Sequence, residues 1–231
     1  MIEVKNVVKK YRKIKALDDV SINIEEGKIT CILGINGVGK STLLKSIMGL
    51  IPVNSGEILI DGERIGPEVY NKISMVPDVY IHYRNMTIEE IFNFMDIFYK
   101  NWDMDKAYRM LEYFRLSKEK KISELSMGGA ARVKIITGFA QNSKYLLLDE
   151  PFSGIDLFTR EDFIGAMTGE FLEEGSSIIL TTHEIGEIEH IADNVILLDN
   201  GKVIKEFSPE QQREQFGKSI VDIMREEYRN A

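Results

Sequence analysis

Residues 34–41 read Gly-Ile-Asn-Gly-Val-Gly-Lys-Ser and match the pattern G-x-x-x-x-G-K-S at every fixed position. The apolar stretch 29–33 precedes the motif, and residues 41–50 carry apolar side chains at helical spacing. In this strand–loop–helix context the glycines let backbone N–H groups and the helix N-terminus converge on phosphate oxygens. The motif therefore predicts a phosphate-binding loop between a buried strand and a helix.

The loop provides most of the candidate nucleotide-binding residues. Lys40 is expected to place a positive charge between the β- and γ-phosphates. Ser41 would offer its hydroxyl to Mg²⁺, and Thr42 would hydrogen-bond the α-phosphate. The full candidate set in the loop is Gly34, Asn36, Gly37, Gly39, Lys40, Ser41 and Thr42.

A second segment, residues 145–150, reads as an apolar strand that ends in two carboxylates. The carboxyl ends of parallel strands are where doubly wound folds bind ligands. Asp149 is predicted to hold Mg²⁺ through water, and Glu150 to polarise an attacking water. A solvated acidic pair is the other interpretation, and the phosphate-binding loop disfavours it. His183 ends a further buried strand; alone it would read as structural, but beside these motifs it is a candidate γ-phosphate sensor.

Buried apolar strands alternate with helical segments along the chain, which predicts an α/β fold with a mainly parallel sheet and helices on both faces. From Ile88 to about Ala140 the pattern is helical, aromatic-rich and free of proline, and Thr87 and Glu90 fit a capping box at the start of a helix. We expect a single domain, 1–231, in which this helical subdomain (79–139) is inserted between two core segments, 1–78 and 140–231.

Two dipeptides, Asp61-Gly62 and Asn200-Gly201, are hairpin signals, and Ser208 before Pro209 is a candidate helix N-cap. Short strands are expected at 2–4 and 20–24.

Composition excludes several classes of protein. Lys plus Arg is 29 against Asp plus Glu at 37, and a net charge of −8 disfavours a nucleic-acid partner. Cys31 is the only cysteine, which excludes an intrachain disulfide and predicts a small buried side chain. No apolar run is long enough to span a bilayer. We therefore expect a soluble cytoplasmic protein.

Taken in order, these motifs resemble those of ABC-type ATPases, the nucleotide-binding subunits of ATP-binding-cassette transporters, over roughly residues 2–205. Tyr11 lies where the family has its adenine-stacking aromatic residue. Leu-Ser-Met-Gly at 125–128 is similar to the signature motif, which implies that Ser126 and Gly128 contact ATP held by a second subunit. The resemblance implies a RecA-like P-loop NTPase core with a small antiparallel β-part and an inserted α-helical subdomain. It also implies ATP and Mg²⁺ as cofactors, with Glu150, His183 and Lys40 in catalysis.

Two departures from the family pattern stand out. Met127 and Gly129 replace a Gly and a Gln of the usual signature. In the coupling loop, Asp78 takes the place of the usual Gln after Val-Pro. A carboxylate can also bind Mg²⁺, so Asp78 is a candidate metal ligand beside Ser41 and Asp149. A turn-forming Asp with no ligand role is the alternative.

The resemblance implies a subunit that energises a transporter by ATP-driven dimerisation coupled to a separate integral-membrane permease. The chain would form a homodimer, or a heterodimer with a paralogue, at the inner face of the cell membrane. The variant signature and the lack of a long C-terminal domain favour export. An aromatic cluster is expected to be core, with any exposed part docking the permease: Phe92, Phe94, Phe98, Tyr99 and Trp102.

Two other classes of function remain. A soluble ABC ATPase that powers an assembly, such as iron–sulfur cluster scaffolding, would carry the same motifs. A small-molecule kinase with a P-loop would not explain Ser126, Gly128 and His183.

Overall fold

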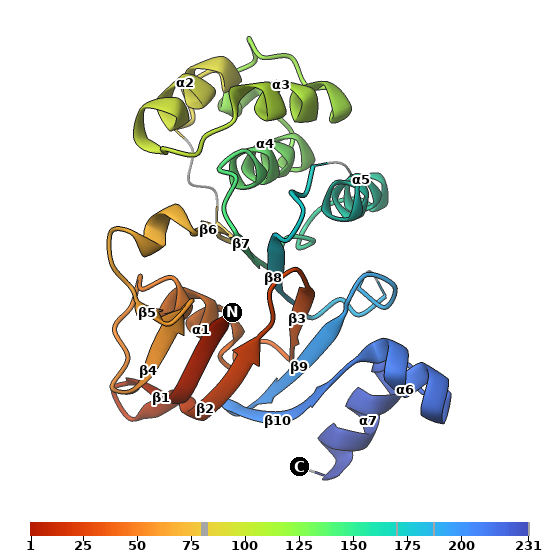
Figure 1. The fold of residues 1–231 in the computed structure, drawn as a ribbon. Helices are drawn as coiled ribbons and strands as arrows, with labels where there is room; N and C mark the ends of the chain where they lie inside the picture. Colours follow the sequence, from red (N-terminus) through yellow and green to blue (C-terminus); the bar gives the residue numbers. More distant parts are fainter. Residues whose placement is uncertain (80–82, 170, 187, 231) are drawn as a thin grey trace.

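The computed structural model describes residues 1–79, 83–169, 171–186 and 188–230, and its strands form two sheets (Figure 1). The smaller sheet is antiparallel, with the order β2-β1-β4-β5. Its strands are β1 (Ile2–Tyr11), β2 (Ile14–Ile24), β4 (Ser55–Ile60) and β5 (Glu63–Arg64).

The larger sheet has six strands in the order β10-β9-β3-β8-β7-β6, and all pairs except β10 with β9 are parallel. The predicted mainly parallel sheet is therefore confirmed. Its strands are β3 (Ile29–Leu33), β6 (Ile73–Val76), β7 (Tyr145–Asp149), β8 (Ser177–Thr182), β9 (Asn194–Asp199) and β10 (Lys202–Phe207). The two sheets meet where β2 lies beside the β9–β10 hairpin, and Asp18 N donates to Gly201 O at 2.8 Å.

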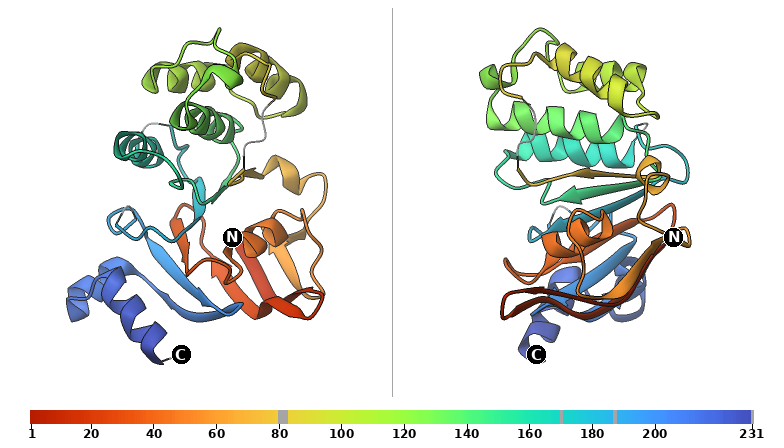
Figure 2. Two further views of the ribbon diagram at one scale, coloured as in Figure 1. Left: turned by 180° about the vertical axis from the view of Figure 1, so that it is seen from behind. Right: turned by 90° about the vertical axis from the view of Figure 1, so that its left-hand side faces the viewer.

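The helices lie in layers on both sides of the larger sheet, as Figure 2 shows. Between the two sheets lies α1, while α4 and α5 cover the opposite face, and α2 and α3 lie beyond α4. The helices are α1 (Lys40–Ile47), α2 (Ile88–Phe98), α3 (Met104–Tyr113), α4 (Met127–Phe139), α5 (Leu157–Thr168), α6 (Pro209–Phe216) and α7 (Ile220–Asn230). Two short 3₁₀ turns are η1 (Val69–Asn71) and η2 (Ile122–Glu124).

Local sequence signals explain several element boundaries. The capping box is confirmed, since Thr87 Oγ1 accepts from Glu90 N at 3.1 Å and Glu90 Oε2 accepts from Thr87 N at 2.8 Å. Both hairpin signals are also confirmed, because Asp61-Gly62 and Asn200-Gly201 have positive φ at both residues and join antiparallel strands. Ser208 is the N-cap of α6, but among the described residues its side chain makes no capping hydrogen bond.

The first two strands are longer than predicted. The sequence indicated strands at 2–4 and 20–24, whereas β1 has 10 residues and β2 has 11. The basic residues between them interrupt the apolar alternation, and shifts of register between Val4 and Lys10 carry the pairing past those positions. Periodicity alone could not reveal a strand that continues through bulges.

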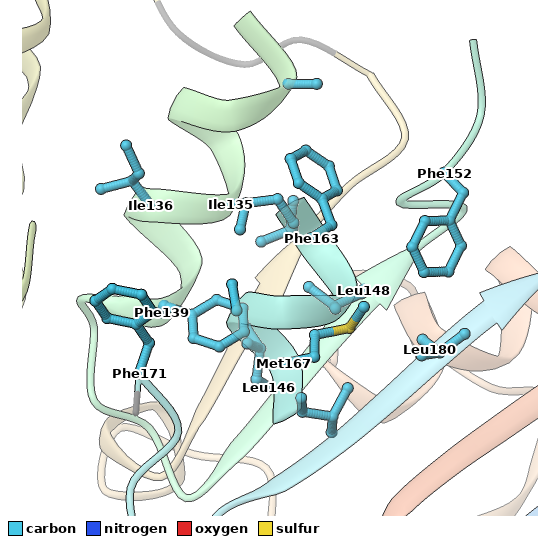
Figure 3. Packing of buried hydrophobic residues seen from close by; sticks show 14 of the residues in the cluster. Ile135, Ile136, Phe139, Leu146, Leu148, Phe152, Phe163, Met167, Phe171 and Leu180 are labelled. Atoms are coloured by element: carbon cyan, nitrogen blue, oxygen red, sulfur yellow. The ribbon is translucent and has the colours of Figure 1, made fainter. Parts of the chain in front are cut away.

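Two apolar cores lie on opposite faces of the larger sheet. On one face Leu146 and Leu148 of β7 pack with residues of α4 and α5, including Phe139 and Phe163 (Figure 3). Leu147 faces the other way, into the core that contains α1 and the antiparallel sheet. The expectation for Cys31 is confirmed, because its thiol is buried and burial raises its pKa.

Candidate functional site

A pocket of about 440 Å³ lies where β3 enters α1, next to the end of β7 and the β1–β2 hairpin. It brings together the loop residues, Tyr11, Asp78 and Glu150 from four separate parts of the chain. The lining residues are Tyr11, Ile14, Ala16, Asn36, Gly37, Gly39, Lys40, Ser41, Thr42, Asp78 and Glu150.

The glycines of the loop meet steric requirements that other residues would not. Gly39 has φ +112° and caps α1, and a Cβ on it would lie 2.3 Å from Ala16 O. A Cβ on Gly34 would lie 2.5 Å from Leu198 O, so the loop presses directly against the end of β9. Gly37 has φ +89° with open space around it. The loop backbone can therefore approach a phosphate closely.

Lys40 lies inside this loop with only 5% of its side chain exposed. Its ammonium donates to Gly34 O at 2.7 Å and lies 3.1 Å from Glu150 Oε1. The cation is thus held at the floor of the pocket, between the phosphate-binding loop and the carboxylate at the end of β7.

Asp149 is 1% exposed, and its two oxygens differ sharply. Oδ1 accepts from Ser41 Oγ and from Thr181 Oγ1, each at 2.8 Å. Oδ2 is buried and has no hydrogen-bond partner among the described residues. Burial raises the pKa of this carboxyl and the nearby Asp78 raises it too, while the Ser41 and Thr181 hydrogen bonds act in the opposite direction.

The donors at this point suit a magnesium ion. A hydroxyl and carboxylate oxygens are the ligands that Mg²⁺ prefers, and the orphaned Asp149 Oδ2 is the kind of acceptor that a metal ion or its water would satisfy. Among the described residues, no group of three His, Cys, Asp or Glu side chains could hold a metal ion without further ligands. A site of this kind would need the oxygens of a bound phosphate to complete it.

Glu150 follows directly and faces His183. Its backbone has φ 47°, and its N–H donates to Thr181 Oγ1 at 3.0 Å. Glu150 Oε2 lies 2.9 Å from His183 Nδ1, and Oε1 lies against Lys40. The structure therefore brings together the three side chains that the sequence nominated for catalysis.

Tyr11 lies at the opposite rim of the pocket. Its ring is half exposed at the end of β1, and Lys9 Nζ lies 5.1 Å from the ring centroid. An open aromatic face at this position can stack on a planar base.

Ser126 and Gly128 do not line this pocket in the described part of the chain. Ser126 is the N-cap of α4 and accepts from Gly129 N at 3.1 Å. A Cβ on Gly128 would lie 3.1 Å from Thr159 Oγ1, and the neighbouring Met127 is exposed. These residues therefore form a second surface of the same chain.

Sequence reasoning missed three residues at this site. Thr181 Oγ1 donates to Asp149 Oδ1 and accepts from the backbone N–H of Glu150, and its place in a strand-end Thr-Thr-His segment was the signal. Lys134 of α4 donates to the carbonyls of Pro77 and Asp78 at 2.7 and 3.1 Å, and its burial lowers its pKa. Its signal was a lysine between apolar residues of α4.

The third missed residue, Tyr228 of α7, gave no sequence signal. Its hydroxyl donates to Leu198 O at 2.9 Å, and a Cβ placed on Gly34 would lie 3.4 Å from it. The C-terminal helix thus contacts the strand end on which the phosphate-binding loop rests.

A glycine-rich loop between β3 and α1, with a buried Asp and a following Glu at the end of β7, defines a P-loop nucleoside triphosphatase. The comparison with known families is specific, since the ABC transporter family matches residues 17–153. The chain belongs to the ABC transporter family, as an ATP-binding subunit that hydrolyses ATP.

Relatives with established names cover most of the chain. The ABC transporter ATP-binding protein YtrB of Bacillus subtilis is 31% identical over 218 residues, 94% of this chain and 75% of the relative. The petrobactin import ATP-binding protein YclP of the same organism is 32% identical, over 93% of this chain and 89% of the relative. The lipopolysaccharide export protein LptB of Haemophilus influenzae is 30% identical, over 91% and 92%.

Solved structures agree with the fold. The ATP-binding subunit of an ABC transporter superposes with a TM-score of 0.87 at 29% identity, and the alignment covers 99% of each chain. A dimeric post-hydrolysis state of the cassette MJ0796, bound to ADP and Pi, has a TM-score of 0.80 at 27% identity and covers 90% of this chain and 99% of that one. The RecA-like core predicted from the motifs is thereby confirmed.

The relatives do not support the expectation of export over import, because proteins named for import and for export match this chain at similar identity. They also do not favour a soluble assembly ATPase, since those named above are transport proteins. In the described residues, no helix has both the length and the apolar character needed to cross a bilayer.

Proposed function

We propose that this ATPase energises a separate integral-membrane permease, with which it lies at the inner face of the cell membrane, and that it works as a dimer that closes on ATP. The observation that carries the proposal is the Lys40–Glu150–His183 arrangement in a pocket that can accept ATP, together with a separate apolar groove elsewhere on the molecule.

In hydrolysis, Glu150 acts as the general base and takes a proton from the attacking water. His183 holds the second oxygen of that carboxylate, and Lys40 binds the phosphates once they enter the loop. Ser41 and Asp149, with Asp78 nearby, would hold Mg²⁺, which neutralises charge on the phosphates when bound. Tyr11 would stack on the adenine, while Asn36 and Thr42 contact the phosphates from the loop.

Dimerisation explains why Ser126 and Gly128 lie outside the pocket. In a closed dimer each chain would present these residues to the γ-phosphate bound by its partner. The dimeric cassette among the structural neighbours supports this arrangement. Since the chain carries both halves of such a site, we favour a homodimer over a heterodimer with a paralogue.

A groove on the helical side of the molecule is the proposed docking surface. It has a volume of about 150 Å³, and Tyr83, Met86, Phe94 and Tyr99 contribute to its lining. The ring of Phe94 packs on the exposed Phe98 with centroids 4.6 Å apart. An exposed aromatic surface of this kind would receive a short helix of the permease. The inserted helical subdomain, 79–139, would then be the part that couples the two proteins. Export stays a prediction.

Affinity capture of the tagged protein from detergent-solubilised native membranes tests the proposal. We expect a polypeptide with several membrane spans to co-purify with the wild type, and to be lost with Phe98→Glu, whose parent side chain is 66% exposed. Phe216→Glu is the matched control, since Phe216 is 62% exposed on α6, away from the groove. Capture of soluble partners alone, with ATPase activity intact, would overturn the proposal in favour of an assembly ATPase.

A further inference from the structure

Lys134 is a cation in an apolar helix. It is 9% exposed, and its neighbours Val133, Ile135 and Ile136 belong to the core that α4 shares with the larger sheet. Burying an ammonium group is costly unless hydrogen bonds and opposite charges compensate for the lost water. The contacts of this side chain should therefore show what it does.

Those contacts join α4 to the segment that leaves β6. Lys134 Nζ donates to Pro77 O at 2.7 Å and to Asp78 O at 3.1 Å. Beyond these carbonyls, Asp78 lines the nucleotide pocket, whereas Lys134 itself lines the apolar groove together with Met75 and Phe94. One side chain thus lies between the two functional surfaces and fixes the backbone that connects them.

Charge connects the same residues. Burial lowers the pKa of Lys134, and the negative charges of Asp78 and Asp149 both raise it. The charge of Asp78 also raises the pKa of Asp149. The carboxylates of Asp78 and Asp149 place negative charge where the phosphates of ATP, themselves negative, would have to enter. A buried cation at this point offsets part of that repulsion.

We propose that Lys134 is a positioning residue of the nucleotide site, which holds the Pro77–Asp78 backbone and offsets the negative charge that Asp78 brings to the phosphate end of the pocket. The inference rests on the proposed function, since it takes the pocket to be the ATP site. Lys134 acts on the nucleotide through this segment rather than by touching it.

A double-mutant cycle with equilibrium binding of ATP in the absence of Mg²⁺ tests the proposal. Lys134→Met removes the charge and the hydrogen bonds, Lys134→Gln removes the charge but keeps a donor, and Lys134→Arg keeps both. Each is made in the wild type and in Asp78→Asn. Thermal unfolding without nucleotide checks that every variant folds.

We expect Lys134→Met and Lys134→Gln to weaken Mg²⁺-free binding by about fivefold or more, the size of a direct pairwise coupling. In the Asp78→Asn background the same changes should cost less than about twofold. Lys134→Arg should bind ATP nearly as the wild type does. If Lys134→Met does not fold, Lys134→Gln carries the test.

Equal losses in the two backgrounds would show that Lys134 does not offset the charge of Asp78, and would overturn the proposal. Failure of the proposed function would look different, because the wild type itself would then bind no ATP or capture no permease.

Discussion

Lys40 Nζ lies 3.1 Å from Glu150 Oε1, so the cation of the phosphate-binding loop and the proposed base form an ion pair inside the nucleotide pocket. Both side chains are largely buried there, which makes the pairing stronger than it would be in water. A phosphate that enters the loop competes with Glu150 for Lys40. ATP binding would therefore release one carboxylate oxygen to accept a proton from water.

The substitution Glu150→Gln tests the role of that ion pair and of the proposed base. The amide keeps the size of the side chain but cannot accept the proton, and it no longer holds Lys40 by charge. We expect ATP to bind at least as tightly as in the wild type, the closed dimer to accumulate on size-exclusion chromatography, and turnover to fall by about 10²-fold or more. Turnover at the wild-type rate would show that another group is the base.

Asp78→Gln tests the unusual carboxylate of the coupling segment. Without metal, Asp78 should repel the γ-phosphate, whereas a glutamine would not. The variant is expected to bind ATP about three- to tenfold more tightly in the absence of Mg²⁺. The gain in affinity on adding Mg²⁺ should shrink accordingly. Equilibrium binding with and without the metal measures both values, and an unchanged ratio would leave Asp78 as a turn residue.

Asp149→Asn should trade function for stability. Because burial raises the pKa of Asp149 above 3.8, the protonated carboxyl contributes stability in full below pH 3.8, and this contribution is lost as the pH rises through the raised pKa. At pH 7 the buried charge is a cost, while Asn can still accept from Ser41 and Thr181. We expect the Tm of the nucleotide-free protein to rise by about 2–4 °C at pH 7.

The difference between Asp149→Asn and the wild type should shrink towards pH 4, and Mg²⁺ should no longer strengthen ATP binding. Asp103→Asn is the control of opposite sign, because the backbone hydrogen bond from Lys106 lowers the pKa of that carboxyl. A lower Tm for Asp149→Asn at pH 7 would contradict the expected cost of the buried charge.

Tyr228→Phe tests whether α7 supports the phosphate-binding loop. Removing the hydroxyl deletes its hydrogen bond to Leu198 O, next to Gly34, and should cost about 1 kcal/mol of stability. The KM for ATP should also rise, by about threefold, the effect of losing roughly 0.6 kcal/mol of positioning.

Tyr113→Phe is the matched control for Tyr228→Phe, since its hydroxyl donates to Asp162 O at 3.2 Å and Tyr113 does not line the described part of the nucleotide pocket. It should lower the stability to a similar extent and leave KM unchanged. Equal KM values for the two variants would mean that α7 acts on stability alone.

The sequence predicted the parts of the site that are encoded by contiguous residues. The loop at 34–42 and the carboxylates after β7 needed only a motif and the rule that parallel strands end at one edge. The roles of Lys134 and Tyr228 could not be predicted, because their partners lie 56 and 30 residues away in the chain and no periodic pattern encodes such a contact. The full lengths of β1 and β2 could not be predicted for a different reason, since their register shifts break the alternation that marks a strand.

Neighbouring residues of β7 face two different cores. Leu146 and Leu148 belong to the core beneath α4 and α5, and Leu147 belongs to the core around α1. Truncating Leu147 would loosen the support of the phosphate-binding loop, whereas truncating Leu146 would loosen the helices beside the docking groove. Neighbouring residues of one strand therefore affect two properties separately, namely the binding of nucleotide and the mobility of the helices beside the groove.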